Sequence, residues 1–214
     1  AAFRQMPQEV WAWYLYRRGV CRQASPNPGH QALVQLEHRF GDRFRLITQN
    51  VDGLHLRAGN TLGRTYQIHG NVDYMRCAQA CTDDITPIPE AVPFKAKGES
   101  LTEADQALLR CPACNGWARP HVLWFDEFYN EVYFRFQSSL QVAEEADLLM
   151  VIGTSGSTNL PHQVALRVAQ VGGLLLDINP ETNPFSEYAI HTGGYFLPFA
   201  SGEILPDLVT LLTS

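Results

Sequence analysis

Residues 46–70, LITQNVDGLHLRAGNTLGRTYQIHG, decide the fold predicted for this chain. The stretch begins with an apolar run at Leu46 and continues through the polar side chains Gln49, Asn50 and Asp52. It then has some helical character and ends as a predicted strand before His69. This order is how an α/β sheet brings side chains to the carboxyl ends of its strands, where ligands bind. Amides, a carboxylate and a histidine at such an edge can hold a polar ligand and transfer a proton. The alternative is a polar βα turn followed by a surface histidine.

Helical and strand periodicities alternate along the rest of the chain. Apolar residues at helical spacing predict helices over 5–18, 30–40, 102–109, 131–146, 161–171 and 203–212. Short aliphatic runs predict further strands at 72–75, 121–125, 148–152, 174–178 and 195–197. Because near-continuous aliphatic strands that alternate with helices are typical of buried parallel sheets, we expect an α/β fold.

Composition limits the classes of protein. The 214 residues, 45% of them hydrophobic, are enough for one α/β domain, with or without a small insertion. No apolar run approaches the roughly 18–20 residues of a membrane span, and no charged-then-apolar leader is visible, so we expect a cytoplasmic protein without a membrane partner. A net charge of −6 provides no basic footprint for nucleic acid.

Four of the five cysteines form two closely spaced pairs, Cys77/Cys81 and Cys111/Cys114. They lie in a Pro-rich stretch with few large apolar residues, so a metal would replace a hydrophobic core there. Paired short spacings predict zinc, and four thiolates leave no open coordination position, which makes the metal structural rather than catalytic. The alternative is buried or partly oxidised cysteines.

A turn at Gly153-Thr154-Ser155-Gly156 follows one predicted strand, and Asn179 and Glu181 follow the next. Backbone N–H groups in a glycine-rich turn before a helix can approach a phosphate. Polar residues just past the neighbouring strand are where nucleotide-binding folds commonly contact a ribose. Each signal alone is weak, since such a turn is often only a tight turn.

Six motifs together resemble the sirtuins, the NAD-dependent protein-lysine deacylases. In chain order they are TQNVDGLH from residue 48, QIHGN from 67, the two cysteine pairs, ARPHVLWFDE from 118, GTS from 153 and DINPE from 177. The resemblance covers nearly the whole chain, and the combination is specific although no single motif is.

The resemblance implies a two-part organisation. Residues 46–76 and 120–214 would form a Rossmann-like parallel sheet that binds NAD. Residues 1–45 would form the helical module of a small domain, and residues 77–119 its zinc-binding insert. NAD and an acyl-lysine protein or peptide would meet in the cleft between the two domains.

The resemblance also implies a role for individual residues. His69 matches the general base of the family. Asn50 and Asp52 match the residues that hold the nicotinamide ribose and the nicotinamide amide, with Gln49 beside them. The remaining matches are Thr154, Ser155 and Asn179 for the NAD phosphates and adenine ribose, and residues 122–127, with Val122, Trp124 and Phe125, for pairing with the substrate peptide as an added strand.

In the implied reaction the acyl oxygen attacks the ribose as nicotinamide leaves, and the products are nicotinamide and O-acyl-ADP-ribose. Asp52 would orient the leaving amide. Neutral His69 would accept a proton from a ribose hydroxyl, a task that suits a histidine near its ordinary pKa of about 6.5.

Three departures from the family pattern stand out. The leading strand and the Gly-Ala-Gly-x-Ser loop that contacts the NAD phosphates have no counterpart in this chain. Asp126 stands where many members have glycine, so a negative charge would border the peptide groove. Cys77 and Cys81 are separated by three residues where two are commoner, a spacing that zinc accepts.

Tyr14 and Arg17 resemble the Tyr-x-x-Arg pair of the desuccinylating sirtuins. Positions i and i+3 share one face of a helix, and a guanidinium binds a carboxylate better than an ammonium does. The pair would therefore bind a succinyl or malonyl chain, so the protein would remove these acidic acyl groups from lysine as well as acetyl groups. The alternative is a core tyrosine beside a solvated arginine.

Other functions on the same scaffold stay open from sequence. An ADP-ribosyltransferase or NAD glycohydrolase would release nicotinamide without an acyl peptide. A catalytically silent module that senses NAD or binds proteins would differ by binding NAD without turnover.

Overall fold

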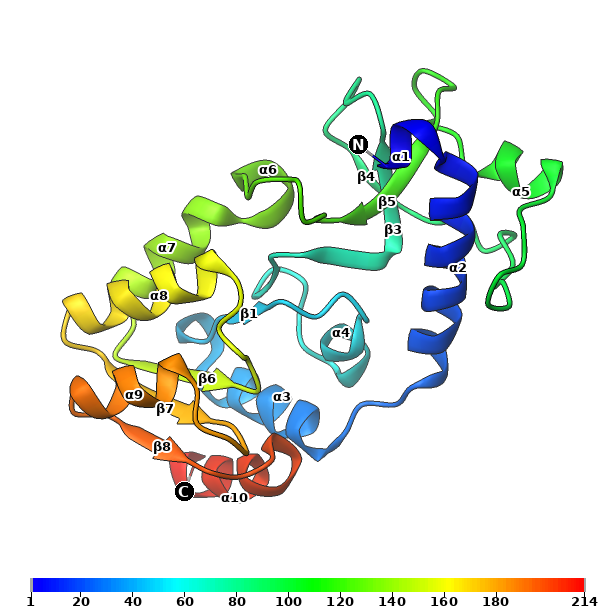
Figure 1. The fold of residues 1–214 in the computed structure, drawn as a ribbon. Coiled ribbons are helices and arrows are strands. Elements are labelled where there is room, and N and C mark those ends of the chain that lie inside the picture. The colour runs from blue at the N-terminus through cyan, green and yellow to red at the C-terminus, as the bar shows by residue number, and fades with distance from the viewer. Residues whose placement is uncertain (1, 214) are drawn as a thin grey trace. The chain divides into compact units, whose positions relative to one another are not determined.

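The computed structural model describes residues 2–213, which form two compact units containing both helices and strands (Figure 1). The first unit comprises Ala1–Ser25, Thr48–Leu54 and Gln67–Phe134. The second comprises Pro26–Ile47, His55–Tyr66 and Arg135–Ser214. The predicted α/β class is confirmed. Among the described helices, none combines the length and the apolar character needed to cross a membrane.

The first unit consists of an antiparallel sheet covered by a long helix. Its helices are α1 (Ala2–Gln5), α2 (Pro7–Gln23), α5 (Glu103–Leu108) and α6 (Glu131–Phe134), and its strands are β3 (Gly70–Cys77), β4 (Ile85–Pro87) and β5 (Ala118–Val122). The sheet has the order β4-β3-β5 with both pairs antiparallel. Helix α2 begins with a proline in its first turn, where no intrahelical N–H is lost.

The apolar face of α2 anchors this unit. Trp11 and Leu15 are fully buried and pack in one cluster with Met75 of β3 and Ala118 of β5. The Trp11 indole N–H donates to the Ala118 carbonyl at 2.8 Å, so the largest buried side chain also satisfies its polar atom. Arg18, one turn further, pairs with Asp73 of β3 at 3.0 Å.

The second unit contains the parallel sheet. Its helices are α3 (Pro28–Phe40), the 3-10 turn η1 (Gly41–Arg43), α7 (Phe136–Glu144), α8 (Asn159–Gln170), α9 (Pro184–His191) and α10 (Ser201–Thr213), and its strands are β6 (Leu148–Ile152), β7 (Leu174–Ile178) and β8 (Tyr195–Leu197). The short elements β1 (Leu46–Thr48), α4 (Leu54–Ala58) and β2 (Thr65–Gln67) lie at the boundaries between the two units. Strands β6, β7 and β8 pair in parallel, and β1 pairs with β2.

Side chains alternate between the two faces of this sheet. Leu176 and Ile178 pack against α3 and α10, whereas the buried Asp177 between them bonds to Asn183 just before α9. Figure 1 shows α3 and α10 on one side of β6–β8 and α7, α8 and α9 on the other. This three-layer arrangement is the expected outcome of parallel strands that must be covered on both faces.

Two predicted elements differ in the structure. The helix expected over 131–146 is divided into α6 and α7, because Arg135 between them adopts a left-handed conformation with φ of 53°. The strand expected at 121–125 lies earlier, at β5, and runs antiparallel to β3 rather than within the parallel sheet. All five residues of β5 are buried although its sequence, ARPHV, is not continuously apolar, and the apolar run that suggested a parallel strand, 122–125, lies where β5 ends.

Helix α9 was not predicted, although its sequence contains a start signal. The Asn183 carboxamide accepts from the Phe185 N–H at 2.8 Å, and Pro184 occupies the first helical position. The predicted domain boundaries stay a prediction. The compact units group the chain differently at α3, which packs on α10 of the second unit.

A buried carboxylate connects α3 to the loop between α4 and β2. Glu37 is 3% exposed and accepts from the Asn60 side chain at 2.8 Å, from the backbone N–H and the hydroxyl of Thr61, and from Arg64 at 3.4 Å. Burial alone would raise the pKa of this carboxyl, but the hydrogen bonds of Thr61, Asn60 and Arg64 outweigh it and lower the pKa. The folded protein therefore stabilises the charged carboxylate of Glu37.

We predict that Glu37→Gln destabilises the protein by about 1–3 kcal/mol, because the new amide group places a donor against the donors of Asn60 and Thr61. The wild-type contribution is complete above the unfolded-state pKa of about 4.3 and disappears as pH falls through the lower folded-state pKa. Urea unfolding followed by circular dichroism from pH 7 to pH 3 measures both effects. The exposed Glu90→Gln is the matched control, and equal stability of the two variants at pH 7 would contradict the role of Glu37.

Candidate functional site

The four paired cysteines converge at one end of the antiparallel sheet. Cys77 ends β3, and all four sulfur atoms lie within 4.8 Å of one another. The Sγ atoms of Cys77 and Cys114 are 3.7 Å apart, and those of Cys81 and Cys111 are 3.6 Å apart. A tetrahedron with Zn–S bonds of about 2.3 Å has edges of about 3.8 Å. The predicted zinc site is therefore confirmed as a four-sulfur cluster of the right size.

The second cysteine pair lies in a tight hairpin. The Cys111 N–H donates to the Gly116 carbonyl at 2.8 Å, and Asn115 in the same turn has a positive φ of 56°. The Gln79 N–H points at the Cys77 sulfur at 3.4 Å, as is usual around thiolates that bind a metal. Four thiolate donors in a closed set suit structural zinc and leave no position for a reacting water.

His69 lies between β2 and β3 and has both ring nitrogens engaged. Its Nδ1 is 3.0 Å from the Gln49 carbonyl oxygen, and its Nε2 is 2.7 Å from the Tyr129 hydroxyl. Burial lowers the pKa of His69, and the hydrogen bond to the Gln49 carbonyl opposes this in part. The imidazole is therefore neutral at pH 7, the form that a general base requires.

The polar turn that precedes α4 folds back on itself. The Asn50 N–H donates to the Thr48 hydroxyl at 3.1 Å, and one Asp52 carboxylate oxygen accepts from the Leu54 N–H at 2.8 Å. Gly53 between them has a φ of 71°, which favours glycine. The structure thus brings the backbone of Gln49 to His69 and keeps Asn50 and Asp52 in the same turn. Their roles stay predictions.

The predicted nucleotide residues of the second unit gather at the carboxyl ends of β6 and β7. The Gly153 N–H donates to the Ile178 carbonyl at 3.0 Å, and the Asn179 side chain donates to the Thr154 carbonyl at 2.9 Å. The Ser155 hydroxyl lies 2.5 Å from that of Ser157. Glu181 is exposed, and its carbonyl oxygen accepts from the Asn183 side chain at 3.4 Å.

His162 at the start of α8 holds the same loop and was not singled out from sequence. Its Nε2 donates to the Gly156 carbonyl at 2.7 Å, and its ring stacks on Phe185 with centroids 4.5 Å apart. A Cβ at Gly156 would lie 3.1 Å from this ring nitrogen, and Gly156 has a φ of 72°. The sequence signal that could have identified His162 is its position shortly after the Gly-Thr-Ser-Gly turn that it holds.

The segment expected to pair with a peptide continues from β5. The Leu123 N–H donates to the His69 carbonyl at 2.9 Å, and the Trp124 N–H donates to Glu127 at 3.0 Å. Arg119 pairs with Glu127 and lies over the Trp124 ring, with its guanidinium carbon 3.5 Å from the ring centroid. Phe125 is fully exposed. The segment is therefore anchored to His69 near its start and to Arg119 at its end, while the Phe125 side chain between them faces solvent.

Tyr14 and Arg17 of α2 have different partners. The Tyr14 hydroxyl accepts from the Trp124 indole N–H at 2.9 Å, and burial raises the pKa of this phenol. The Arg17 guanidinium carbon lies 5.4 Å from the Trp13 ring centroid, at the exposed surface of the helix. The structure joins Tyr14 to the predicted peptide segment, and the acyl-binding role of the pair stays a prediction.

Tyr129 is the second residue that sequence reasoning missed. It lies in an aromatic run, FDEFYNEVYF from residue 125, that reads as core or surface packing rather than chemistry. Its contact with His69 spans 60 residues of sequence, so no local pattern marks it.

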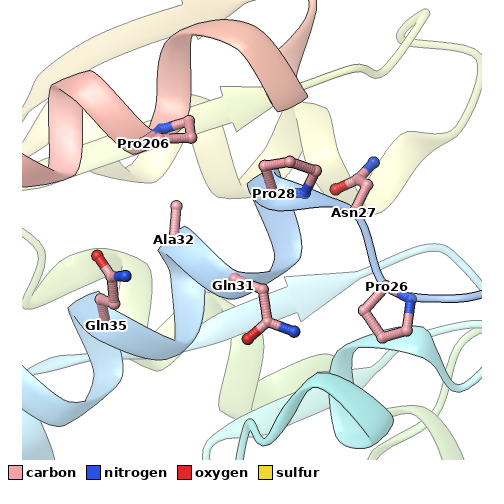
Figure 2. A pocket seen from close by; sticks show the side chains of 7 residues that line it. All are labelled: Pro26, Asn27, Pro28, Gln31, Ala32, Gln35 and Pro206. Carbon is pink, nitrogen blue, oxygen red and sulfur yellow. The ribbon is translucent and has the colours of Figure 1, made fainter.

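A cavity of about 390 Å³ opens between α3 and α10 of the second unit (Figure 2). Pro28, Ala32 and Gln35 line it from α3, and Pro206 lines it from α10. None of its lining residues is a predicted site residue, and its side chains offer neither a titratable group nor a nucleophile.

Comparison with known proteins identifies the family. The sequence profile of the Sir2 family matches residues 1–159. An NAD-dependent protein deacylase of Leptospira interrogans is 39% identical over 215 residues, which cover 97% of this chain and 76% of the relative. One of Thermus thermophilus is 38% identical over 194 residues, covering 88% and 68%.

Solved structures agree with the sequence comparison. A mutant Sir2 homologue in complex with ADP-ribose superposes with a TM-score of 0.80 at 31% identity, over 99% of this chain and 76% of the other. A Sir2 homologue in complex with NAD superposes with a TM-score of 0.78, also at 31% identity, over 99% and 74%. The match in sequence, in fold and in the cysteine cluster has one reading: this chain belongs to the Sir2 family.

Proposed function

We propose that the chain is an NAD-dependent protein-lysine deacylase that removes acetyl groups and also acidic acyl groups such as succinyl and malonyl. One observation carries the proposal. His69 is a neutral, half-buried imidazole whose Nδ1 is held by a backbone carbonyl, and its neighbouring backbone bonds to the segment at 122–127. A base and a peptide-pairing segment on adjacent backbone is an arrangement suited to deacylation of a bound peptide. The relatives named NAD-dependent protein deacylase support the reaction class.

The loop at the end of β6 fits a dinucleotide. Gly153 has a φ of 60°, and no atom lies within 4 Å of the position where a Cβ would be, so the backbone is open to a ligand there. Thr154, Ser155 and Asn179 would hold the phosphates and the adenine ribose. When bound, NAD supplies the ADP-ribosyl group that receives the acyl chain.

The chain's own residues supply orientation and proton transfer. Asn50 and Asp52 would hold the nicotinamide end, with Asp52 as an acceptor for the amide. His69 accepts a proton at Nε2, since its Nδ1 already carries one. Residues 122–127 bind the substrate backbone as an added strand, with Val122, Trp124 and Phe125 beside the acyl-lysine. The partners are therefore acyl-lysine proteins or peptides.

We predict that each chain binds one zinc ion and that Cys111→Ser removes it. Structural zinc contributes on the order of 10 kcal/mol in small ribbons, so loss of one ligand should unfold the region around β4 and α5. Elemental analysis and hydrogen exchange measure the two effects. Cys21→Ser, which changes a cysteine outside the cluster, is the matched control. Full zinc content in the Cys111 variant would rule out this ligand set.

We predict that His69→Ala lowers kcat/KM for deacylation by about 10²–10⁴-fold without unfolding the protein. Because the pKa of His69 is lowered, wild-type activity should rise with pH through a value below 6.5 and then stay level. Assays of acetyl-peptide turnover from pH 5 to 8, with and without NAD, test this. Nicotinamide release that needs no acyl peptide would instead indicate a glycohydrolase or ADP-ribosyltransferase, and NAD binding without turnover a silent module.

The acyl preference depends on Tyr14 and Arg17. A charge-assisted hydrogen bond from Arg17 to a succinyl carboxylate is worth roughly 1.5–3 kcal/mol, or about ten- to a hundredfold in kcat/KM. We predict that Arg17→Met lowers desuccinylation by this factor and changes deacetylation little, with Arg17→Lys intermediate because it keeps the charge but loses the planar fork. Matched peptides measure both ratios. Equal losses on both acyl groups would show that Arg17 only packs on Trp13.

A further inference from the structure

The hydroxyl of Tyr129 contacts Nε2 of His69, the one ring nitrogen of that residue that can accept a proton. A carbonyl oxygen only accepts hydrogen bonds, so the 3.0 Å contact with Gln49 places a hydrogen on Nδ1. In the neutral imidazole the lone pair is then on Nε2, and the Tyr129 O–H donates to it at 2.7 Å. The direction of both hydrogen bonds follows from this one backbone acceptor.

The two side chains form an aligned pair within the first unit. Their rings are stacked, with centroids 5.8 Å apart and planes 24° from parallel. Both residues are half-buried. Tyr129 follows the 122–127 segment, whose residue Leu123 bonds to the His69 carbonyl. The same stretch of chain therefore carries the peptide-pairing backbone and a phenol directed at the base.

A substrate hydroxyl can reach the Nε2 lone pair in two ways. It can displace the phenol, or it can transfer its proton through it. A phenol has one donor hydrogen and two acceptor lone pairs, so it can donate to Nε2 and accept from a second hydroxyl at the same time. Its ordinary pKa of about 10 lies above that of imidazole, so the phenol keeps its proton until a replacement is supplied.

We propose that Tyr129 is a further catalytic residue, which relays a proton from the substrate ribose to His69. The Tyr129 O–H bond breaks as its hydrogen forms a bond to Nε2. The phenol oxygen takes the proton of the ribose hydroxyl, whose electron pair stays on the ribose oxygen for its attack on the acyl carbon. His69 becomes an imidazolium, and Tyr129 ends as a neutral phenol. This step rests on the proposed deacylase function.

Tyr129→Phe tests the relay because it removes only the hydroxyl. We expect kcat for acetyl-peptide deacylation to fall by about 10²-fold. Exchange of labelled nicotinamide into NAD precedes the proton transfer and should be retained. The KM for NAD should change little. A kcat equal to or above that of the wild type would overturn the proposal, since the phenol would then only cover the base.

Histidine NMR titration of the NAD-free protein is an independent readout. The Tyr129 hydroxyl stabilises the neutral form of His69, so its removal should raise the pKa of His69. An unchanged pKa would show that the hydrogen bond does not form in solution and would overturn the proposal even if the variant lost activity.

Tyr133→Phe is the matched control, because its hydroxyl bonds to Asp83 at 3.2 Å and not to His69. Circular dichroism and zinc content verify that each variant is folded. Failure of the proposed function is distinguishable from failure of the relay. The proposed function fails if the wild-type protein shows no NAD-dependent deacylation. The relay fails if Tyr129→Phe matches the wild type in kcat or in the pKa of His69.

Discussion

The close approach of β3 and β5 at Gly70 is the constraint on which the candidate site depends. A Cβ at this position would lie 2.0 Å from the His121 carbonyl oxygen, and the φ of 84° is one that side chains rarely adopt. Gly70 faces Val122 in the strand register, and the neighbouring Leu123 N–H donates to the His69 carbonyl. A glycine is therefore what allows His69 and the segment at 122–127 to share adjacent backbone.

The cysteine cluster closes the opposite end of the same strand pair. Cys77 lies opposite Ala118 in the register, one strand length away from Gly70. A metal held there connects the end of β3 to the hairpin that leads into β5. The pair is thus held by steric fit at the His69 end and by the cysteine cluster at the other, while Met75 of β3 and Ala118 of β5 pack in the core cluster of α2 between them.

In the second unit, side chains orient a backbone loop by holding its carbonyl groups. Asn179 donates to the Thr154 carbonyl and His162 to the Gly156 carbonyl. In a trans peptide the C=O and the following N–H point in opposite directions. The N–H groups of Ser155 and Ser157 are therefore turned away from these two side chains. Fixed N–H groups in a glycine-containing turn are suited to an anionic ligand, because their orientation costs nothing at the moment of binding.

The sequence by itself determined the α/β class, the four-cysteine zinc site and the family resemblance, since apolar periodicity and residue spacing are local properties. It also predicted that His69 and the turn at Gln49 lie close together, because a strand–turn–helix–strand order brings them to one sheet edge. Only the tertiary structure decided that β5 runs antiparallel to β3, and that Tyr129 donates to His69. These features depend on hydrogen bonds between residues far apart in the chain. A pattern of local periodicity carries no information about which distant donor reaches which acceptor.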